Sequence, residues 1–205
     1  MSKIKICGLS RPADIDMVNK VLPDYIGFVF AQSRRQVSEA TARELKAMLS
    51  DQIQAVGVFV NAAPKTIISI CKAGIIDIIQ LHGDEDEEYI SSLKALVSKP
   101  IMKAVRVRST EDILETAKLT CDYLLLDAYK EDQYGGSGET FDWTVITKTS
   151  KPFFLAGGIN TGNVEHALSL ANPYCIDVSS GVETDGFKDY DKIKDIVAKV
   201  RSKAD

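Results

Sequence analysis

Residues 152–183, PFFLAGGINTGNVEHALSLANPYCIDVSSGVE, contain two consecutive strand-to-loop units. A short apolar run ends in Gly157-Gly158, a segment of helical period follows from about Thr161, and a second apolar run ends in Ser179-Ser180-Gly181. Glycines let backbone N–H groups come close to an anion, and a helix beginning after Ser180 adds donors and a favourable dipole. The stretch predicts two adjacent loops suited to a phosphate group. The same sequence is also compatible with two tight turns that need glycine only for their backbone geometry and bind no anion.

The same alternation extends over the whole chain. Apolar runs of strand length alternate with segments of helical period, and eight such units fit into 205 residues at about 26 residues each, close to the minimum for a strand, a helix and two short loops. This order predicts a parallel sheet covered by helices. A closed (β/α)8 TIM barrel and an open doubly wound sheet both fit, and eight short units favour the barrel. Since no linker interrupts the pattern, we expect residues 1–205 to form one domain.

Helix and strand signals place the expected elements. Ser10, Ser38 and Thr110 are expected to cap helices, and Asp142 is expected to open another after the long loop 128–141. The acidic run 84–88 fits a cation site or the first turn of a helix, and the helix dipole favours the second interpretation. The last helix is expected at 190–201, and the expected strands are 3–7, 25–30, 55–60, 75–81, 100–107, 123–126, 153–156 and 175–178.

Composition narrows the class of function. The chain is 45% hydrophobic and 26% charged with a net charge of −4, and its basic residues are scattered. Binding to nucleic acid or to an anionic membrane surface has no electrostatic support, so a phosphate needs a local site. Four dispersed cysteines and two histidines predict no metal site. The start of the sequence does not resemble a signal peptide and no run is long enough to span a membrane, so we expect a cytoplasmic protein with reduced cysteines.

The candidate catalytic and binding residues lie at the ends of the expected strands. In a barrel of this kind the carboxyl ends of the strands surround the active site, and the loops after strands 7 and 8 commonly hold phosphate. The phosphate candidates are therefore Gly157, Gly158, Ser179, Ser180 and Gly181. The other candidates at strand ends or one loop beyond are Cys7, Arg35, Gln80, His82, Arg106, Asp127 and Asp177.

Each candidate has a plainer alternative. A buried cysteine is usually a small hydrophobic residue, but Cys7 lies at a strand end, where a nearby cation or N–H group can favour its thiolate. Asp127 could cap a helix, although the next helix begins far downstream. Arg35 is either a solvated surface residue or a planar ligand for a carboxylate. For His82, a satisfied turn residue and a ligand contact are equally compatible, and the glycines at 135–138 are explained equally well by flexibility.

Taken together, several motifs resemble the phosphoribosylanthranilate isomerase family along the whole chain. Each motif alone is modest, but their combination and order are specific. They are Lys5-Ile6-Cys7-Gly8, Gly27-Phe28-Val29-Phe30 with Ser33-Arg34-Arg35, Gly57-Val58-Phe59-Val60-Asn61, Gln80-Leu81-His82-Gly83, Leu125-Leu126-Asp127, Gly135-Gly136-Ser137-Gly138 with Phe141-Asp142-Trp143, Leu155-Ala156-Gly157-Gly158-Ile159-Asn160 and Asp177-Val178-Ser179-Ser180-Gly181-Val182-Glu183.

The resemblance implies a cofactor-free and metal-free enzyme of tryptophan biosynthesis that performs an Amadori rearrangement on N-(5-phosphoribosyl)anthranilate. By motif, Cys7 is the general base and Asp127 the general acid. Burial is expected to raise the pKa of Asp127, and the pKa of Cys7 is expected to lie below its free value. Arg35 is assigned to the anthranilate carboxylate, while Gln80, His82 and Asp177 are expected to bind substrate. At the position of Glu139 the resemblance leads us to expect a variable residue that is often lysine. We assign no role to Glu139.

Three other interpretations remain at this point. A metal-dependent sugar-phosphate epimerase needs more histidine and carboxylate groups at strand ends, and the related aminoaldose isomerase of histidine synthesis is expected to carry aspartate at the position of Cys7. A non-catalytic barrel that only binds a phosphorylated metabolite is the alternative of a different class. The sequence is compatible with a monomer or a homodimer.

Overall fold

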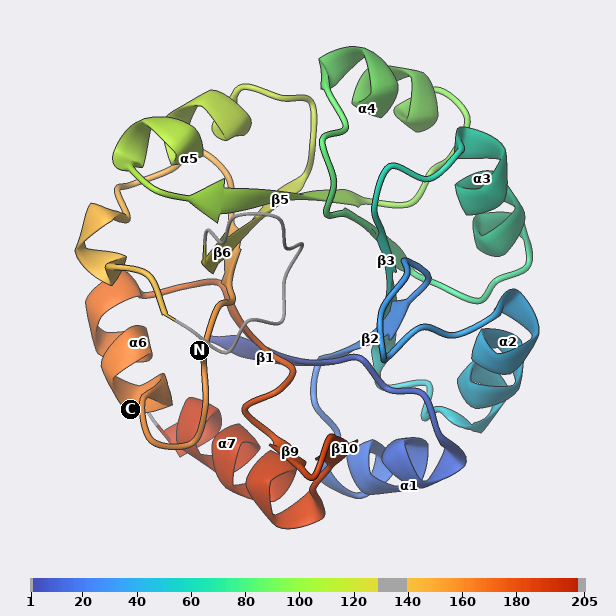
Figure 1. The fold of residues 1–205 in the computed structure, drawn as a ribbon, viewed down its shortest axis with the longest axis vertical. Helices are drawn as coiled ribbons and strands as arrows, with labels where there is room; N and C mark the ends of the chain where they lie inside the picture. The colour runs from blue at the N-terminus through green and yellow to red at the C-terminus, as the bar shows by residue number, and fades with distance from the viewer. Residues whose placement is uncertain (1, 129–139, 203–205) are drawn as a thin grey trace.

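The computed structural model describes residues 2–128 and 140–202. Eight parallel strands form a closed barrel in chain order, and β8 pairs with β1 to complete the ring (Figure 1). This confirms the predicted (β/α)8 architecture over the open sheet. The strands are β1 (Lys3–Cys7), β2 (Tyr25–Val29), β3 (Gln54–Phe59), β4 (Ile78–Leu81), β5 (Ile101–Val107), β6 (Tyr123–Ala128), β7 (Phe153–Leu155) and β8 (Cys175–Val178).

Helices surround the barrel on the outside (Figure 1). Ser38 caps α2 as predicted, with its side chain accepting a hydrogen bond from the Thr41 N–H. No helix within the described ranges is long and apolar enough to cross a membrane. The α-helices are α1 (Pro12–Val21), α2 (Glu39–Met48), α3 (Pro64–Lys72), α4 (Glu87–Lys94), α5 (Thr110–Ala117), α6 (Val164–Ala171) and α7 (Tyr190–Ser202).

Two expected helices take a different form. After Asp142 the chain makes only a single 3-10 turn, η1 (Trp143–Val145), because the segment before Pro152 is short and rich in β-branched residues. Ser180 is followed not by a helix but by a hairpin of β9 (Glu183–Thr184) and β10 (Phe187–Lys188). Asp185 and Gly186 both have positive φ in its turn, which is the conformation that an Asp-Gly pair favours in a tight hairpin.

Smaller differences concern helix starts. The N-cap positions of α1 and α5 are Arg11 and Ser109, each one residue away from the predicted Ser10 and Thr110, and α6 begins three residues after Thr161. In the acidic run, Asp86 caps α4 and the next two glutamates occupy its first turn, as predicted. Glu85 instead is buried in an ion pair with Lys103 at 3.0 Å.

The hydrophobic core has two parts. The larger part fills the layer between the strands and the helices. The smaller part lies inside the barrel and includes Val56, Ile78, Leu125 and Phe154. Side chains alternate between the two faces of a strand, so the next inward position after Leu125 is Asp127. The apolar filling of the barrel thus gives way to polar side chains toward the carboxyl ends of the strands.

Candidate active site

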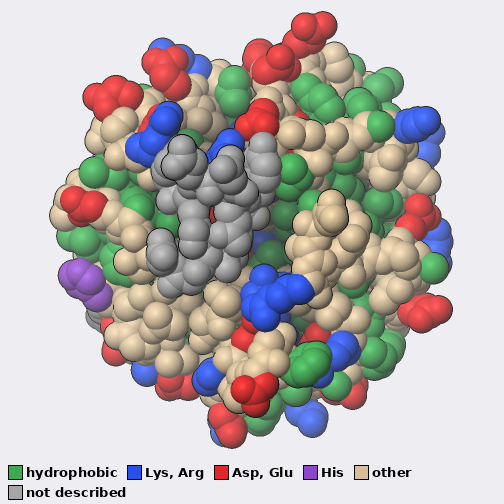
Figure 2. All heavy atoms as spheres, viewed as in Figure 1, with side chains coloured by type: hydrophobic (Ala, Val, Ile, Leu, Met, Phe, Trp, Pro, Cys, Tyr) green, Lys and Arg blue, Asp and Glu red, His purple; other side chains and the backbone are tan. Residues whose placement is uncertain are grey.

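A buried layer of polar side chains lies within the barrel near the carboxyl ends of its strands. Strand alternation places each of them two residues beyond an inward-facing neighbour. Figure 2 shows the face viewed in Figure 1, with Lys and Arg side chains near its middle beside Asp and Glu side chains. The buried or nearly buried members of this layer are Lys5 and Cys7 on β1, Gln80 on β4 with His82 just after it, Asp127 on β6 and Asp177 on β8.

Cys7 is the last residue of β1 and is buried. It pairs with Gly27 on β2, where a Cβ atom would lie only 2.6 Å from the Cys7 sulfur, so glycine makes room for the thiol. Burial raises the pKa of the Cys7 thiol, with a further contribution from Asp177, although Lys5 and Lys188 act in the opposite direction. This direction is opposite to our expectation, because loss of hydration outweighs the neighbouring cations.

Lys5 is fully buried and connects three strands. Its ammonium group donates hydrogen bonds to Asp177 Oδ2 at 2.8 Å and to Gln80 Oε1 at 2.9 Å. Burial disfavours the charge, but Asp177 and Cys7 outweigh it, and the pKa of Lys5 is raised above its ordinary value. Asp177 Oδ1 is one of two buried side-chain N or O atoms in the described part of the chain without a hydrogen-bond partner. It is therefore available to a polar ligand group.

A chain of contacts runs from Lys5 to Asp127. Gln80 Nε2 lies 2.8 Å from His82 Nδ1, and His82 Nε2 lies 3.2 Å from Asp127 Oδ2. The other carboxylate oxygen of Asp127 accepts a hydrogen bond from the Ala128 N–H at 2.9 Å. The predicted residues Gln80, His82 and Asp127 thus form one buried group.

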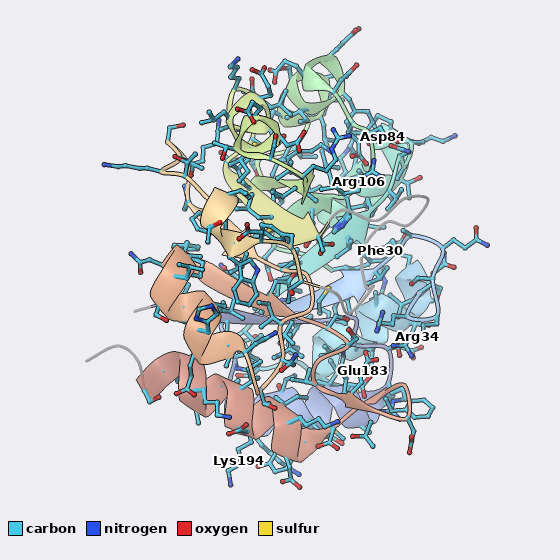
Figure 3. All side chains as sticks on the ribbon, turned by 60° about the vertical axis from the view of Figure 1, so that its left-hand side comes forward. Phe30, Arg34, Asp84, Arg106, Glu183 and Lys194 are labelled. Atoms are coloured by element: carbon cyan, nitrogen blue, oxygen red, sulfur yellow. The ribbon has the colours of Figure 1, made fainter. Side chains whose placement is uncertain are left out.

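Arg35 is held by a carboxylate of this chain. Its Nε and Nη2 donate to the two oxygens of Glu183 at 2.7 and 3.0 Å, and Lys188 donates to the same carboxylate at 2.8 Å. Burial disfavours the charge of Glu183, but Arg35 and Lys188 lower its pKa to about 2. Arg34 also contacts Glu183, and Figure 3 places Phe30, Arg34 and Glu183 on the same side of the molecule. The guanidinium edge that Glu183 leaves open can bind a second planar anion.

The two glycine-bearing loops meet as predicted. An isolated bridge joins Asn160, in the loop after β7, to Gly181, in the loop after β8. Gly157 and Gly158 both have positive φ, at 79° and 65°, which explains their residue type. Ser179 Oγ donates to the Cys7 carbonyl at 3.0 Å, so the loop after β8 lies directly beside the end of β1.

Two groups of predicted residues stand apart from this arrangement. Arg106 is paired with Asp84 at 2.9 Å at the rim of the barrel (Figure 3). The glycines at 135–138 and Glu139 lie outside the described residues. In the ranges that the structure covers, no three His, Cys, Asp or Glu side chains form a group that could hold a metal ion.

Three residues of the site were not among the predicted candidates: Lys5, Glu183 and Lys188. Lys5 had a usable signal, because it stands two residues before Cys7 in the same strand and so faces the same side. Glu183 ends one of the family motifs but was given no role. Lys188 had no signal, since only the unexpected hairpin brings it to the carboxylate of Glu183.

Comparison with known proteins agrees with this geometry. A sequence model described as N-(5'phosphoribosyl)anthranilate (PRA) isomerase matches residues 4–199. The N-(5'-phosphoribosyl)anthranilate isomerase of Endomicrobium trichonymphae is 48% identical over 202 residues, covering 98% of this chain and 100% of the relative.

Solved structures agree with the family match. The crystal structure of phosphoribosyl anthranilate isomerase from Thermotoga maritima has a TM-score of 0.88 and 32% identity, covering 98% of this chain and 100% of that one. A second structure, of the isomerase in complex with reduced 1-(o-carboxyphenylamino)-1-deoxyribulose 5-phosphate, has a TM-score of 0.83 and 30% identity at the same coverage. The chain is an isomerase and belongs to the N-(5'-phosphoribosyl)anthranilate (PRA) isomerase family.

Proposed function

We propose that the protein converts N-(5-phosphoribosyl)anthranilate to 1-(o-carboxyphenylamino)-1-deoxyribulose 5-phosphate in tryptophan biosynthesis, by an Amadori rearrangement without a cofactor. Cys7 is the general base and Asp127 the general acid. The observation that carries this assignment is the position of both groups in one buried polar layer at the carboxyl ends of β1 and β6. Family membership and the ligand of the related solved structure support the choice of substrate.

The chemistry requires one acid and one base. Asp127 gives a proton to the furanose ring oxygen as the bond from C1′ to that oxygen breaks, and the anthranilate nitrogen supplies the electron pair for a C1′=N double bond. The resulting cationic imine acidifies the proton on C2′, which the Cys7 thiolate removes. The electron pair from that C–H bond forms the C1′=C2′ bond and neutralises the nitrogen. The enolamine then tautomerises to the ketone at C2′.

The raised pKa of Cys7 is compatible with this role. Lys5 and Lys188 already act to lower the pKa of Cys7. The cationic imine forms next to the thiol and adds a further positive charge that favours the thiolate. Burial otherwise favours the thiol, so the thiol proton must pass to solvent before the Cys7 thiolate can remove the proton on C2′.

The remaining candidates orient the substrate between two anionic ends. Arg35 takes the anthranilate carboxylate on the guanidinium edge that Glu183 leaves open. The loops containing Gly157, Gly158, Ser179, Ser180 and Gly181 take the phosphate, as the bridge between them supports. Asp177 Oδ1 accepts a hydrogen bond from a ribose hydroxyl, while Gln80 and His82 contact each other and act on the substrate through Asp127. Such two-point binding aligns the sugar for proton transfer.

The test follows anthranilate fluorescence after N-(5-phosphoribosyl)anthranilate is generated in situ. We expect decay far above the spontaneous rate, and a fall in kcat of about 10²-fold or more in both Cys7→Ala and Asp127→Asn. Cys71→Ala is the matched control, because Cys71 is 8% exposed like Cys7 but lies in α3. Near-parental activity of either site variant would refute that residue's role. If the folded parent causes no decay above background, the reaction is wrong and the aminoaldose substrate of histidine synthesis is tested next.

A further inference from the structure

We propose that Lys5 and Gln80 are positioning residues that hold His82 as its Nε2–H tautomer, so that His82 donates a hydrogen bond to Asp127 during the reaction. The proposal concerns the buried chain Asp177–Lys5–Gln80–His82–Asp127, whose successive contacts are between 2.8 and 3.2 Å. Its kinetic part rests on Asp127 being the general acid, whereas its structural part does not.

The direction of the hydrogen bonds is fixed at Lys5. An ammonium group is a donor only, so the Gln80 atom that faces it must be the oxygen. The other end of the Gln80 side chain is then the NH2 group, which can only donate, and it lies 2.8 Å from His82 Nδ1. His82 Nδ1 must accept and carries no proton. In a neutral imidazole the proton is then on Nε2, which faces Asp127 Oδ2.

The alternative arrangements each create a buried clash of donors. Turning the Gln80 amide over would direct its NH2 group at the Lys5 ammonium. Placing a proton on His82 Nδ1 would direct it at the Gln80 NH2 group. Lys5 itself cannot move away at low cost, because it is fully buried and paired with Asp177 at 2.8 Å. The chain therefore has one satisfied direction, from Lys5 to Asp127.

This direction assists the proposed acid. When Asp127 gives its proton to the ring oxygen, negative charge develops on its carboxyl group. The His82 N–H group that already faces Oδ2 then donates to a carboxylate, and such charge-assisted bonds are stronger than neutral ones. The hydrogen bond from His82 stabilises Asp127 more after proton transfer than before it, so we expect this hydrogen bond to raise kcat. The opposite tautomer would present a lone pair to Asp127 and compete with the substrate for the acidic proton.

The test is the tautomer of His82, observed by ¹⁵N NMR on the full chain at neutral pH without substrate. The protein has only two histidines, and His166 is exposed, so His166→Gln identifies the His82 signals. We expect a protonated Nε2 and an unprotonated Nδ1 in the parent. Gln80→Glu replaces the donor that faces Nδ1 by an acceptor, so Nδ1 should become protonated. Gln54→Glu is the matched control, because it makes the same change at an exposed position at the opposite end of the barrel.

Kinetics on the same variants separate positioning from substrate contact. We expect Gln80→Glu to lower kcat about 10- to 100-fold with little change in KM, while Gln54→Glu remains at the parental value. Gln80→Met removes the polar contacts without adding charge, and should leave both His82 tautomers populated with a smaller loss of kcat. Gln80→Met also provides the test if the Gln80→Glu variant does not fold.

Three results would overturn the proposal. The first is a proton on Nδ1 in the parent, and the second is an unchanged His82 tautomer in both Gln80 variants. The third is a rise in KM with an unchanged kcat, which would make Gln80 a substrate contact. Failure of the parent to turn over N-(5-phosphoribosyl)anthranilate would refute the proposed function, while the NMR result would still decide the hydrogen-bond direction.

Discussion

At the scale of single residues, the carboxylate of Glu183 contacts three cationic side chains, those of Arg34, Arg35 and Lys188. Its pKa of about 2 in the folded chain lies below its ordinary value of 4.5. The folded state therefore binds fewer protons than the unfolded state between these values. The stabilisation from Glu183 is complete above pH 4.5 and is lost as the pH falls toward 2.

We predict that Glu183→Gln lowers the free energy of unfolding at pH 7 by about 2 kcal/mol. The difference between parent and variant should narrow as the pH falls below about 4.5. Urea unfolding at several pH values from 7 to 3 measures it, with Glu39→Gln as a control in an exposed pair with Arg43. A difference that stays constant over this range would mean that the charge of Glu183 does not stabilise the fold.

At the scale of elements, the β9–β10 hairpin connects the loop after β8 to Arg35. Its turn contains Gly186 with a φ of 83°, which an L-residue adopts only at a cost. We predict that Gly186→Ala destabilises the fold by about 1 kcal/mol and raises KM, because a strained turn loosens the contact between Glu183 and Arg35. Steady-state kinetics and urea unfolding measure the two effects.

A matched glycine separates the two effects of this substitution. Gly74 follows α3 with a φ of 70°, and a Cβ atom there would contact nothing within 4 Å. Gly74→Ala should therefore cost a similar free energy of unfolding with an unchanged KM. If both substitutions change KM equally, the effect reflects general loss of stability, and the hairpin does not orient Arg35.

At the scale of the whole molecule, the barrel could be predicted because its signals are local. Alternating strand and helix periods specify parallel strands, and Gly157-Gly158 and Ser179-Ser180-Gly181 mark the loops that meet after β7 and β8. The hairpin was missed because its turn signal at Asp185-Gly186 lies where a helix was expected. Gln80, His82, Asp127 and Asp177 could be predicted as site residues because they stand at strand ends. The hydrogen bonds that join them through Lys5 could not be predicted, since they depend on side-chain positions that the sequence does not specify.

The pair of Lys5 and Asp177 also joins the first and last strands of the barrel. Lys5 and Asp177 are register partners in the β1–β8 pairing, with side chains 0% and 6% exposed. Removing one member leaves a buried charge without its partner, so we predict that Lys5→Met and Asp177→Asn each lower the free energy of unfolding by about 3–5 kcal/mol. The double variant should lose clearly less than the sum of the single losses, because the second substitution removes the charge that the first left unpaired.

The single tryptophan, Trp143, is buried and lies in η1, between β6 and β7 along the chain. Its fluorescence measures unfolding in urea. Lys46→Met and Asp77→Asn form the control cycle, because that ion pair has the same 2.8 Å length but is 25% and 29% exposed. A large coupling at Lys5–Asp177 and a small one at Lys46–Asp77 would mean that burial makes the closing pair strong. Equal coupling energies in the two cycles would mean that the backbone pairing of β1 with β8 closes the barrel. The Lys5–Asp177 ion pair would then contribute to the active site and not to closure of the barrel.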